Sequence, residues 1–92
     1  MEFEWQRDKA AENIRKHKVS FTEAATVFGD FLAATMPDPD HSDDELRYIT
    51  IGMSNLRRVL MVAHAERQGR TRIISARKLT PNERRIYEET QR

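Results

Sequence analysis

Three side chains in the C-terminal half of the sequence have the types that phosphodiester cleavage requires. His64, Glu66 and Arg77 all lie within residues 57–78. An imidazole and a carboxylate can exchange protons with a substrate, and a guanidinium presents a fork of N–H donors that fits an oxyanion. The alternative interpretation is that all three are solvated residues on the polar side of an antiparallel sheet, where most such residues occur. Spacing alone favours this alternative.

Residues 57–78 are predicted to form a β-hairpin that would carry these side chains. Apolar runs at 59–65 and 73–76 flank a short break that contains Gly69, and glycine adopts the positive φ that tight hairpin turns need. We place Gln68 and Gly69 in the turn. The predicted cross-strand pairs are then Arg67 with Arg70, Glu66 with Thr71, His64 with Ile73, Val62 with Ser75, and Leu60 with Arg77.

The two faces of this hairpin follow from the alternation of side chains along a strand. One face would be apolar at one end and ionisable at the other, and it would include the three candidate catalytic residues His64, Glu66 and Arg77. The residues predicted on this face are Leu60, Val62, His64, Glu66, Thr71, Ile73, Ser75 and Arg77. The opposite face would carry Arg72 and Lys78. A bulge or the edge of the sheet could bring these two cations round to the first face.

The composition fits one small domain over residues 1–92, with 38% hydrophobic residues and no cysteine. The lack of cysteine excludes a disulfide framework and a thiolate metal site. The histidines at 17, 41 and 64 do not have the spacing of metal ligands, so we expect neither a metal ion nor another cofactor. No apolar run approaches the roughly 20 residues that cross a bilayer, and the N-terminus is charged, so we expect a cytoplasmic protein without a membrane partner.

The net charge of +1 conceals an uneven distribution along the chain. Residues 1–56 carry 6 Lys or Arg against 11 Asp or Glu, whereas residues 57–92 carry 10 against 4. A cluster of arginines favours an anionic partner, of which nucleic acid is the commonest, because a guanidinium binds phosphate bidentately. Charge segregation also occurs in proteins that only remain soluble or that pair with an acidic protein, and the charge alone does not separate these classes.

Two helices are predicted in the N-terminal third of the chain. Residues 8–17 have an amphipathic pattern, with Asp8 as a candidate cap. Ser20 is expected to open the second helix through a capping box with Glu23. The apolar residues of this second helix recur at i, i+3, i+4 and i+7, which predicts a stripe that faces the core: Phe21, Ala24, Ala25 and Phe28.

Short strands are predicted on either side of an acidic loop. Residues 31–36 are apolar and precede a proline, and residues 46–53 alternate between apolar and polar. The loop at 37–45 has two prolines and five acidic residues, so we expect a solvated connection. A brief alternation at residues 1–5 favours a short edge strand.

A final helix is predicted from Pro81, which suits the first helical position, with a capping box between Thr80 and Glu83. This helix has few apolar residues, so we expect it to pack weakly or to be completed by a partner. The predicted fold class is α+β, with a small antiparallel sheet, two N-terminal helices and a C-terminal helix.

Three blocks of the sequence, KHKVSFTEA at 16–24, RYITIG at 47–52 and RIISARK at 72–78, closely resemble the BrnT toxins of bacterial type II toxin–antitoxin systems. The resemblance covers nearly the whole chain. It implies a RelE-like ribonuclease fold, metal-independent cleavage of RNA and inhibition of translation. It also implies a cognate DNA-binding antitoxin of the BrnA type, which would cover the active surface in a hetero-oligomer.

The resemblance implies a set of site residues at the positions that match the family motif. His64 and Glu66 would be the acid and base of an RNA transesterification, and Arg77 would hold the phosphate. The other positions that match the family motif are Arg67, Arg72, Ser75, Lys78, Glu83, Arg84 and Tyr87. We expect the RNA-binding residues to be Arg67, Arg72, Ser75, Lys78, Arg84, Tyr87 and the neighbouring Arg85. The alternative from another functional class is a non-catalytic RNA- or protein-binding module whose basic hairpin attracts phosphate.

Overall fold

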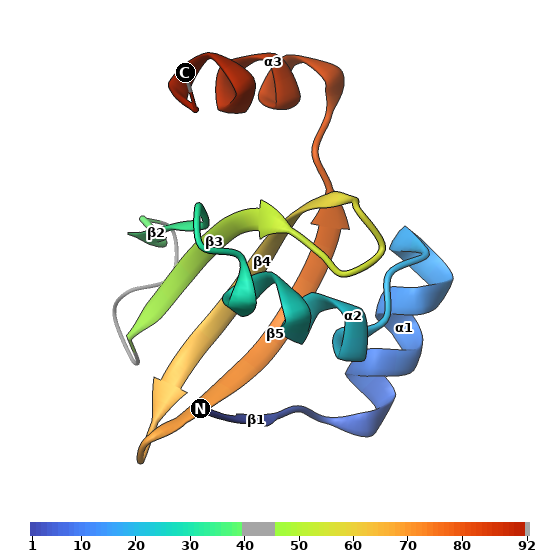
Figure 1. The fold of residues 1–92 in the computed structure, drawn as a ribbon. Helices are drawn as coiled ribbons and strands as arrows, with labels where there is room; N and C mark the ends of the chain where they lie inside the picture. Colours follow the sequence, from blue (N-terminus) through green and yellow to red (C-terminus); the bar gives the residue numbers. More distant parts are fainter. Residues whose placement is uncertain (40–45, 92) are drawn as a thin grey trace.

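The computed structural model describes residues 1–39 and 46–91, and there it contains a five-stranded sheet and three α-helices (Figure 1). The strand order is β1-β5-β4-β3-β2. Neighbouring strands are antiparallel except β1, which runs parallel to β5. The predicted α+β class is confirmed. The elements are β1 Glu2–Glu4, α1 Arg7–His17, α2 Phe21–Thr26, the 3₁₀ turn η1 Val27–Gly29, β2 Ala34–Pro37, β3 Arg47–Met53, β4 Val59–Arg67, β5 Arg70–Lys78 and α3 Pro81–Thr90.

The hairpin formed by β4 and β5 has the predicted turn. Gln68 and Gly69 have φ values of 52° and 78°, and two consecutive positive φ values give the turn whose twist matches that of the flanking strands. The strands pair as predicted from the turn as far as His64 and Ile73.

Beyond His64 the predicted register is wrong, because β5 contains one extra residue. Ala63 pairs with Ser75 while His64 pairs with Ile73, which leaves Ile74 unpaired as a bulge. A single extra residue in one strand of a pair reverses the facing of every side chain after it. The second half of β5 is therefore turned over relative to the prediction.

This bulge separates side chains that were predicted to share a face. The pairs Val62–Ser75 and Leu60–Arg77 do not form. Arg77 consequently lies on the face opposite His64, and the prediction that the two share a face is wrong. The observed pairs are Val62 with Ala76, Met61 with Arg77 and Leu60 with Lys78.

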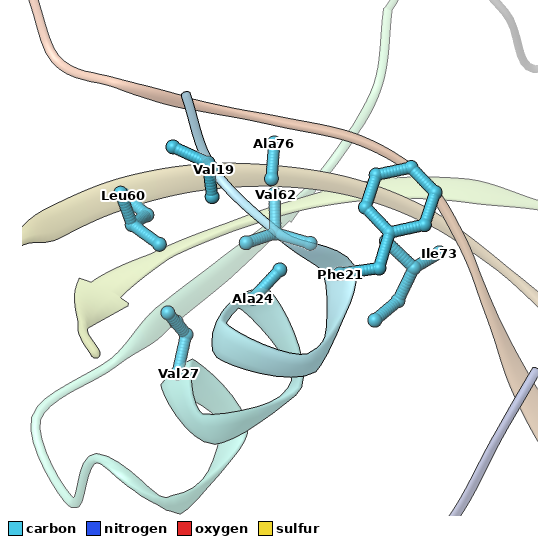
Figure 2. Close-up of a cluster of buried hydrophobic side chains, with 8 residues drawn as sticks. All are labelled: Val19, Phe21, Ala24, Val27, Leu60, Val62, Ile73 and Ala76. Carbon is cyan, nitrogen blue, oxygen red and sulfur yellow. The ribbon is translucent and has the colours of Figure 1, made fainter. Parts of the chain in front are cut away.

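One face of the sheet is covered by α1 and α2, and the hydrophobic core lies between these layers. Figure 2 shows side chains of the α1–α2 connection, α2 and η1 pointing toward those of β4 and β5. Burying each Val, Leu, Ile or Phe side chain contributes about 1.5–3 kcal/mol, so this layer is the main source of stability. The predicted helical stripe is confirmed. The buried cluster consists of Val19, Phe21, Ala24, Val27, Leu60, Val62, Ile73 and Ala76, with Ala25 and Phe28 packed against it.

Asn13 of α1 stabilises the part of β5 that has no strand on the side away from β4. β1 pairs with β5 only over residues 70–72. Further along, Asn13 Nδ2 donates to the Ala76 carbonyl at 2.8 Å, and the Ala76 N–H donates to Asn13 Oδ1 at 3.1 Å. The buried amide of Asn13 therefore takes the place of a strand partner.

The predicted capping box at the start of α2 forms only in part. Ser20 Oγ accepts from the Glu23 N–H at 3.0 Å. The Glu23 carboxylate does not return to the cap; it accepts from Ser54 Oγ at 2.6 Å and from the guanidinium of Arg58. Glu23 is buried, and the positive charge of Arg58 compensates for the cost of burying its carboxylate. These contacts also connect α2 to the segment between β3 and β4.

Other predicted boundaries differ slightly from the observed ones. The N-cap of α1 is Gln6, so Asp8 lies in the first turn and is not the cap. β2 begins later than predicted and includes Pro37, which an edge strand tolerates. In the acidic segment, Asp38 is buried and its N–H donates to the Arg47 carbonyl at 2.9 Å. The prediction of a solvated loop at 40–45 lies outside the described residues.

α3 stands apart from α1 and α2 beyond the sheet (Figure 1). Its capping box between Thr80 and Glu83 is confirmed, with Pro81 in the first turn. No residue of α3 is buried. A groove of about 270 Å³ lies between α3 and the sheet, lined mainly by apolar side chains that include Met61 and Tyr87. In the described ranges, no helix is long and apolar enough to cross a membrane.

Candidate active site

His64 is a core residue on the helix-covered face of β4. Its side chain is only 3% exposed. Its ring packs edge-on to the Phe28 ring, with 4.8 Å between the ring centroids, and stacks on the Tyr48 ring, with 5.8 Å between the centroids. His64 Nε2 lies 2.7 Å from Thr50 Oγ1. Burial lowers the pKa of His64 below its usual range, while the nearby Glu66 carboxylate opposes this shift. The imidazole is therefore neutral near pH 7, and it is out of reach of a substrate.

Glu66 is the accessible neighbour of this histidine. Its side chain is 43% exposed, and Glu66 Oε1 lies 3.3 Å from His64 Nδ1. The Thr71 hydroxyl donates to the two carboxylate oxygens at 3.0 and 3.1 Å. This arrangement holds a carboxylate at the surface with an imidazole behind it. Such a carboxylate can accept a proton from a bound hydroxyl group.

Three arginines, Arg67, Arg70 and Arg72, lie at the turn end of the hairpin, where alternation along the strands places their side chains on the face opposite Glu66. Arg67 and Arg70 face each other across the turn, and both are exposed. Arg72 Nε donates to a carboxylate oxygen of Glu4 at 2.9 Å. This hydrogen bond from Arg72 is the main cause of the lowered pKa of Glu4. β1 therefore contributes a counter-charge at this end.

Arg77 lies on the other face of the sheet, and its guanidinium is already occupied. Its Nη1 and Nη2 donate to the two Glu83 oxygens at 2.8 and 3.0 Å, and Nη2 also lies 3.2 Å from Met61 Sδ. The hydrogen bond from Arg77, followed by that from the Thr80 N–H, lowers the pKa of Glu83 to about 2. Arg77 therefore connects α3 to β5.

The remaining predicted RNA-binding residues do not form one surface with Glu66. Ser75 is exposed and lines a hollow beside Lys16 of α1. Lys78 pairs with Leu60 and therefore lies on the helix-covered face of the sheet. On α3, Arg84 pairs with Glu88 at 3.0 Å, Arg85 pairs with Glu89 at 3.4 Å, and Tyr87 lines the groove beneath the helix. Burial raises the pKa of Tyr87.

Two hydroxyl groups that contact the acid–base pair were not identified from the sequence as site residues. Thr50 contacts His64, and Thr71 contacts Glu66. Thr71 was already placed opposite Glu66 by the predicted hairpin register. Thr50 could have been found only from the pairing of β3 with β4, which neither turn chemistry nor spacing specifies.

The described residues offer no metal centre. Across 1–39 and 46–91, no group of three or more His, Asp or Glu side chains is arranged to hold a metal ion. Within these ranges His64 and Glu66 lie together, but they supply only two metal-binding groups, and His64 Nε2 already lies against the Thr50 hydroxyl.

Comparison with known proteins gives both a family and a fold. Residues 5–83 match the family model described as the ribonuclease toxin BrnT of a type II toxin–antitoxin system. The crystal structure of the Brucella abortus ribonuclease toxin BrnT superposes with a TM-score of 0.69 and 22% sequence identity. The superposition covers 87% of this chain and 97% of that one. At this identity the likeness concerns the fold. A comparison with curated protein sequences found no significant match.

Proposed function

The chain belongs to the family of BrnT ribonuclease toxins of type II toxin–antitoxin systems, and we propose that it is an endoribonuclease that cleaves RNA without a metal ion. The observation that carries this proposal is the position of Glu66. Its carboxylate is exposed, is held by Thr71, lies beside a buried neutral imidazole and is followed directly by Arg67. A general base and a cation that can bind phosphate thus lie at the same end of the hairpin, although their side chains start on opposite faces of the sheet.

The proposed reaction is a transesterification within the RNA chain. Glu66 accepts the proton of a ribose 2′-OH, and the freed oxygen attacks the adjacent phosphorus. Arg67 is the last residue of β4, and its side chain starts on the face opposite Glu66. Its exposed guanidinium reaches round the end of the hairpin and stabilises the charge that develops on the phosphate oxygens. Water at this open end of the hairpin can supply the proton that the leaving 5′-oxygen takes. His64 acts through Glu66, since its ring is buried.

The other predicted site residues have different places in this proposal. Arg72 and Arg70 can guide the RNA strand to the hairpin end, because they flank Thr71, the cross-strand partner of Glu66. We assign Arg77 to the attachment of α3, because its guanidinium already donates hydrogen bonds to both Glu83 oxygens. RNA contacts by the residues farther from Glu66 stay predictions: Ser75, Lys78, Arg84, Arg85 and Tyr87.

We also propose that RNA cleavage inhibits translation in the cytoplasm and that a cognate DNA-binding antitoxin of the BrnA type neutralises it in a hetero-oligomer. Family membership supports an antitoxin partner. The weak packing of α3 supports a role for this helix in binding it, because none of its residues is buried and an apolar groove lies beneath it. A partner that covered this groove would remove apolar surface from water.

Replacing one carboxylate tests the catalytic part of the proposal. Glu66→Gln keeps the acceptor for Thr71 but removes the base, so RNA cleavage by purified protein should fall on the order of 10²-fold or more. Glu88→Gln, at an exposed glutamate of α3, is the matched control and should cleave normally. Undiminished cleavage by Glu66→Gln would remove this residue from the reaction. A wild-type protein that binds RNA without turnover would favour the non-catalytic alternative instead.

A further inference from the structure

A chain of polar side chains runs from Glu66 through the core to strand β2. Glu66 Oε1 lies 3.3 Å from His64 Nδ1, His64 Nε2 lies 2.7 Å from Thr50 Oγ1, and Thr50 Oγ1 lies 2.7 Å from Thr35 Oγ1. Thr50 and His64 are both buried. Four strand positions, on β2, β3 and β4, thus join one surface carboxylate to two hydroxyl groups on the far side of the imidazole.

The hydrogens of this chain can be placed by elimination. A neutral imidazole carries one N–H and one lone pair. If the hydrogen were on His64 Nε2, the lone pair of Nδ1 would face the Glu66 carboxylate at 3.3 Å, and two acceptors would repel each other in a buried setting. If it is on Nδ1, the Thr35 hydroxyl donates to Thr50, and Thr50 donates to Nε2. Every buried polar atom from Thr35 to Nε2 then has a partner of the right kind.

His64 Nδ1 is the one atom whose hydrogen bond is not completed. It is buried and has no partner within hydrogen-bond geometry among the described residues, although Glu66 Oε1 is 3.3 Å away. A small rotation of the half-exposed Glu66 side chain would complete this bond. An N–H in this position therefore points at the carboxylate that the proposed reaction uses.

We propose that Thr50 is a positioning residue that, with Thr35 behind it, holds His64 as the Nδ1–H tautomer and directs this hydrogen at Glu66. The position of the His64 hydrogen follows from the distances within this group of side chains, whereas its effect on cleavage rests on the function proposed above. A donor aimed at Glu66 fixes the carboxylate in the orientation that accepts a proton. Without the Thr50 hydroxyl the imidazole can place its hydrogen on Nε2 and repel the carboxylate, as a wrongly set tautomer does in other acid–base pairs.

Nitrogen NMR of the His64 ring tests the tautomer directly. In ¹⁵N-labelled wild-type protein at neutral pH, the proton should be on Nδ1. In Thr50→Val, which keeps the shape of the side chain but has no hydroxyl, the population should shift toward Nε2–H. Thr50→Ser should restore Nδ1–H, and Thr22→Val, at an exposed threonine of α2, should have no effect. Nε2–H in the wild type, or Nδ1–H unchanged in Thr50→Val, would overturn the proposal.

Cleavage kinetics test the consequence for the reaction. Thr50→Val should reduce kcat on the order of tenfold or more with little change in KM, and Thr50→Ser should recover most of it. An unchanged kcat beside a shifted tautomer would refute the positioning role. If the wild-type protein cleaves no RNA, the proposed function fails while the NMR result still decides the tautomer. If Thr50→Val does not fold, Thr35→Val removes the outer hydroxyl from an exposed strand position and should produce a smaller shift toward Nε2–H.

Discussion

The ion pair between Arg77 and Glu83 predicts that the attachment of α3 depends on pH. α3 has no buried residue, so few apolar contacts hold it to the sheet. Glu83 joins β5 to α3 through both oxygens and also accepts from the Thr80 N–H at 2.9 Å. Protonation of this one carboxylate would therefore weaken the cap of α3 and its link to the sheet together.

The magnitude follows from the lowered pKa of Glu83. A fall from 4.5 to about 2 corresponds to about 3 kcal/mol of unfolding free energy if solvent screens nothing. Both side chains are about one third exposed, Arg77 at 37% and Glu83 at 32%, so we expect about 1 kcal/mol. Because the folded pKa lies below the unfolded value, this stability is present above pH 4.5 and is lost as the pH falls toward 2.

Urea unfolding of Glu83→Gln against wild type measures this contribution. At pH 7 the variant should unfold with a free energy lower by about 1 kcal/mol. The difference should shrink as the pH is lowered from 5 toward 3, because the Glu83 carboxylate takes up a proton in the unfolded protein over this range while it stays ionised in the folded protein until the pH approaches about 2. Glu89→Gln is the matched control, since its pair with Arg85 is exposed and lies within one helix; it should change stability by less than about 0.5 kcal/mol. A difference between wild type and Glu83→Gln that stays constant over this pH range would refute the reasoning.

The same pair distinguishes an anchor from a phosphate ligand at Arg77. If Arg77 only attaches α3, Arg77→Ala and Glu83→Gln should destabilise the protein alike and leave RNA cleavage near the wild-type level. If Arg77 binds the transition-state phosphate, Arg77→Ala should lose on the order of 10²-fold in cleavage, whereas Glu83→Gln frees the guanidinium and should not. We expect the first result, because Arg77 pairs with Met61, away from the hairpin end, and both Glu83 oxygens accept hydrogen bonds from its guanidinium.

RNA cleavage should continue in excess EDTA and leave 2′,3′-cyclic phosphate or 3′-phosphate ends, since Glu66 and Arg67 need no metal ion; 5′-phosphate ends, or activity that requires magnesium, would contradict the mechanism. Hydrogen exchange of the toxin with its antitoxin should show protection within residues 57–91, which include the hairpin and α3. Protection confined to residues 8–28 would instead indicate inhibition from a distance.

The hairpin could be predicted from the sequence because its turn has a local cause. Gln68 and Gly69 take the two positive φ values, and glycine is the residue that does so at no steric cost. The bulge at Ile74 has no such local signal. Ile73 and Ile74 are identical in type, so a register with or without an extra residue buries an isoleucine equally well at this point.

The bulge becomes understandable only with the rest of the fold in place. Thr71, Ile73 and Ala76 are the buried positions of β5, and the odd spacing between the last two requires one extra residue in the strand. The bulge also falls between the end of pairing with β1 at residue 72 and the bonds from Asn13 to Ala76. A change from a strand partner to a helix partner, far away in sequence, is what local patterns cannot predict.

The same limit applies to the candidate site. Residue types suggested His64, Glu66 and Arg77 as candidates and the family resemblance gave them roles, but neither showed which of them a substrate could reach. The helices α1 and α2 cover the middle of this sheet face and leave its hairpin end open. As a result His64 is only 3% exposed, whereas the Glu66 side chain, two residues further along β4, is 43% exposed. If the proposed reaction occurs here, its proton acceptor must be Glu66, and the imidazole can contribute only by orienting that carboxylate. The chemistry of the pair is therefore decided by the depth of each residue in the sheet rather than by the usual preference for histidine as the base.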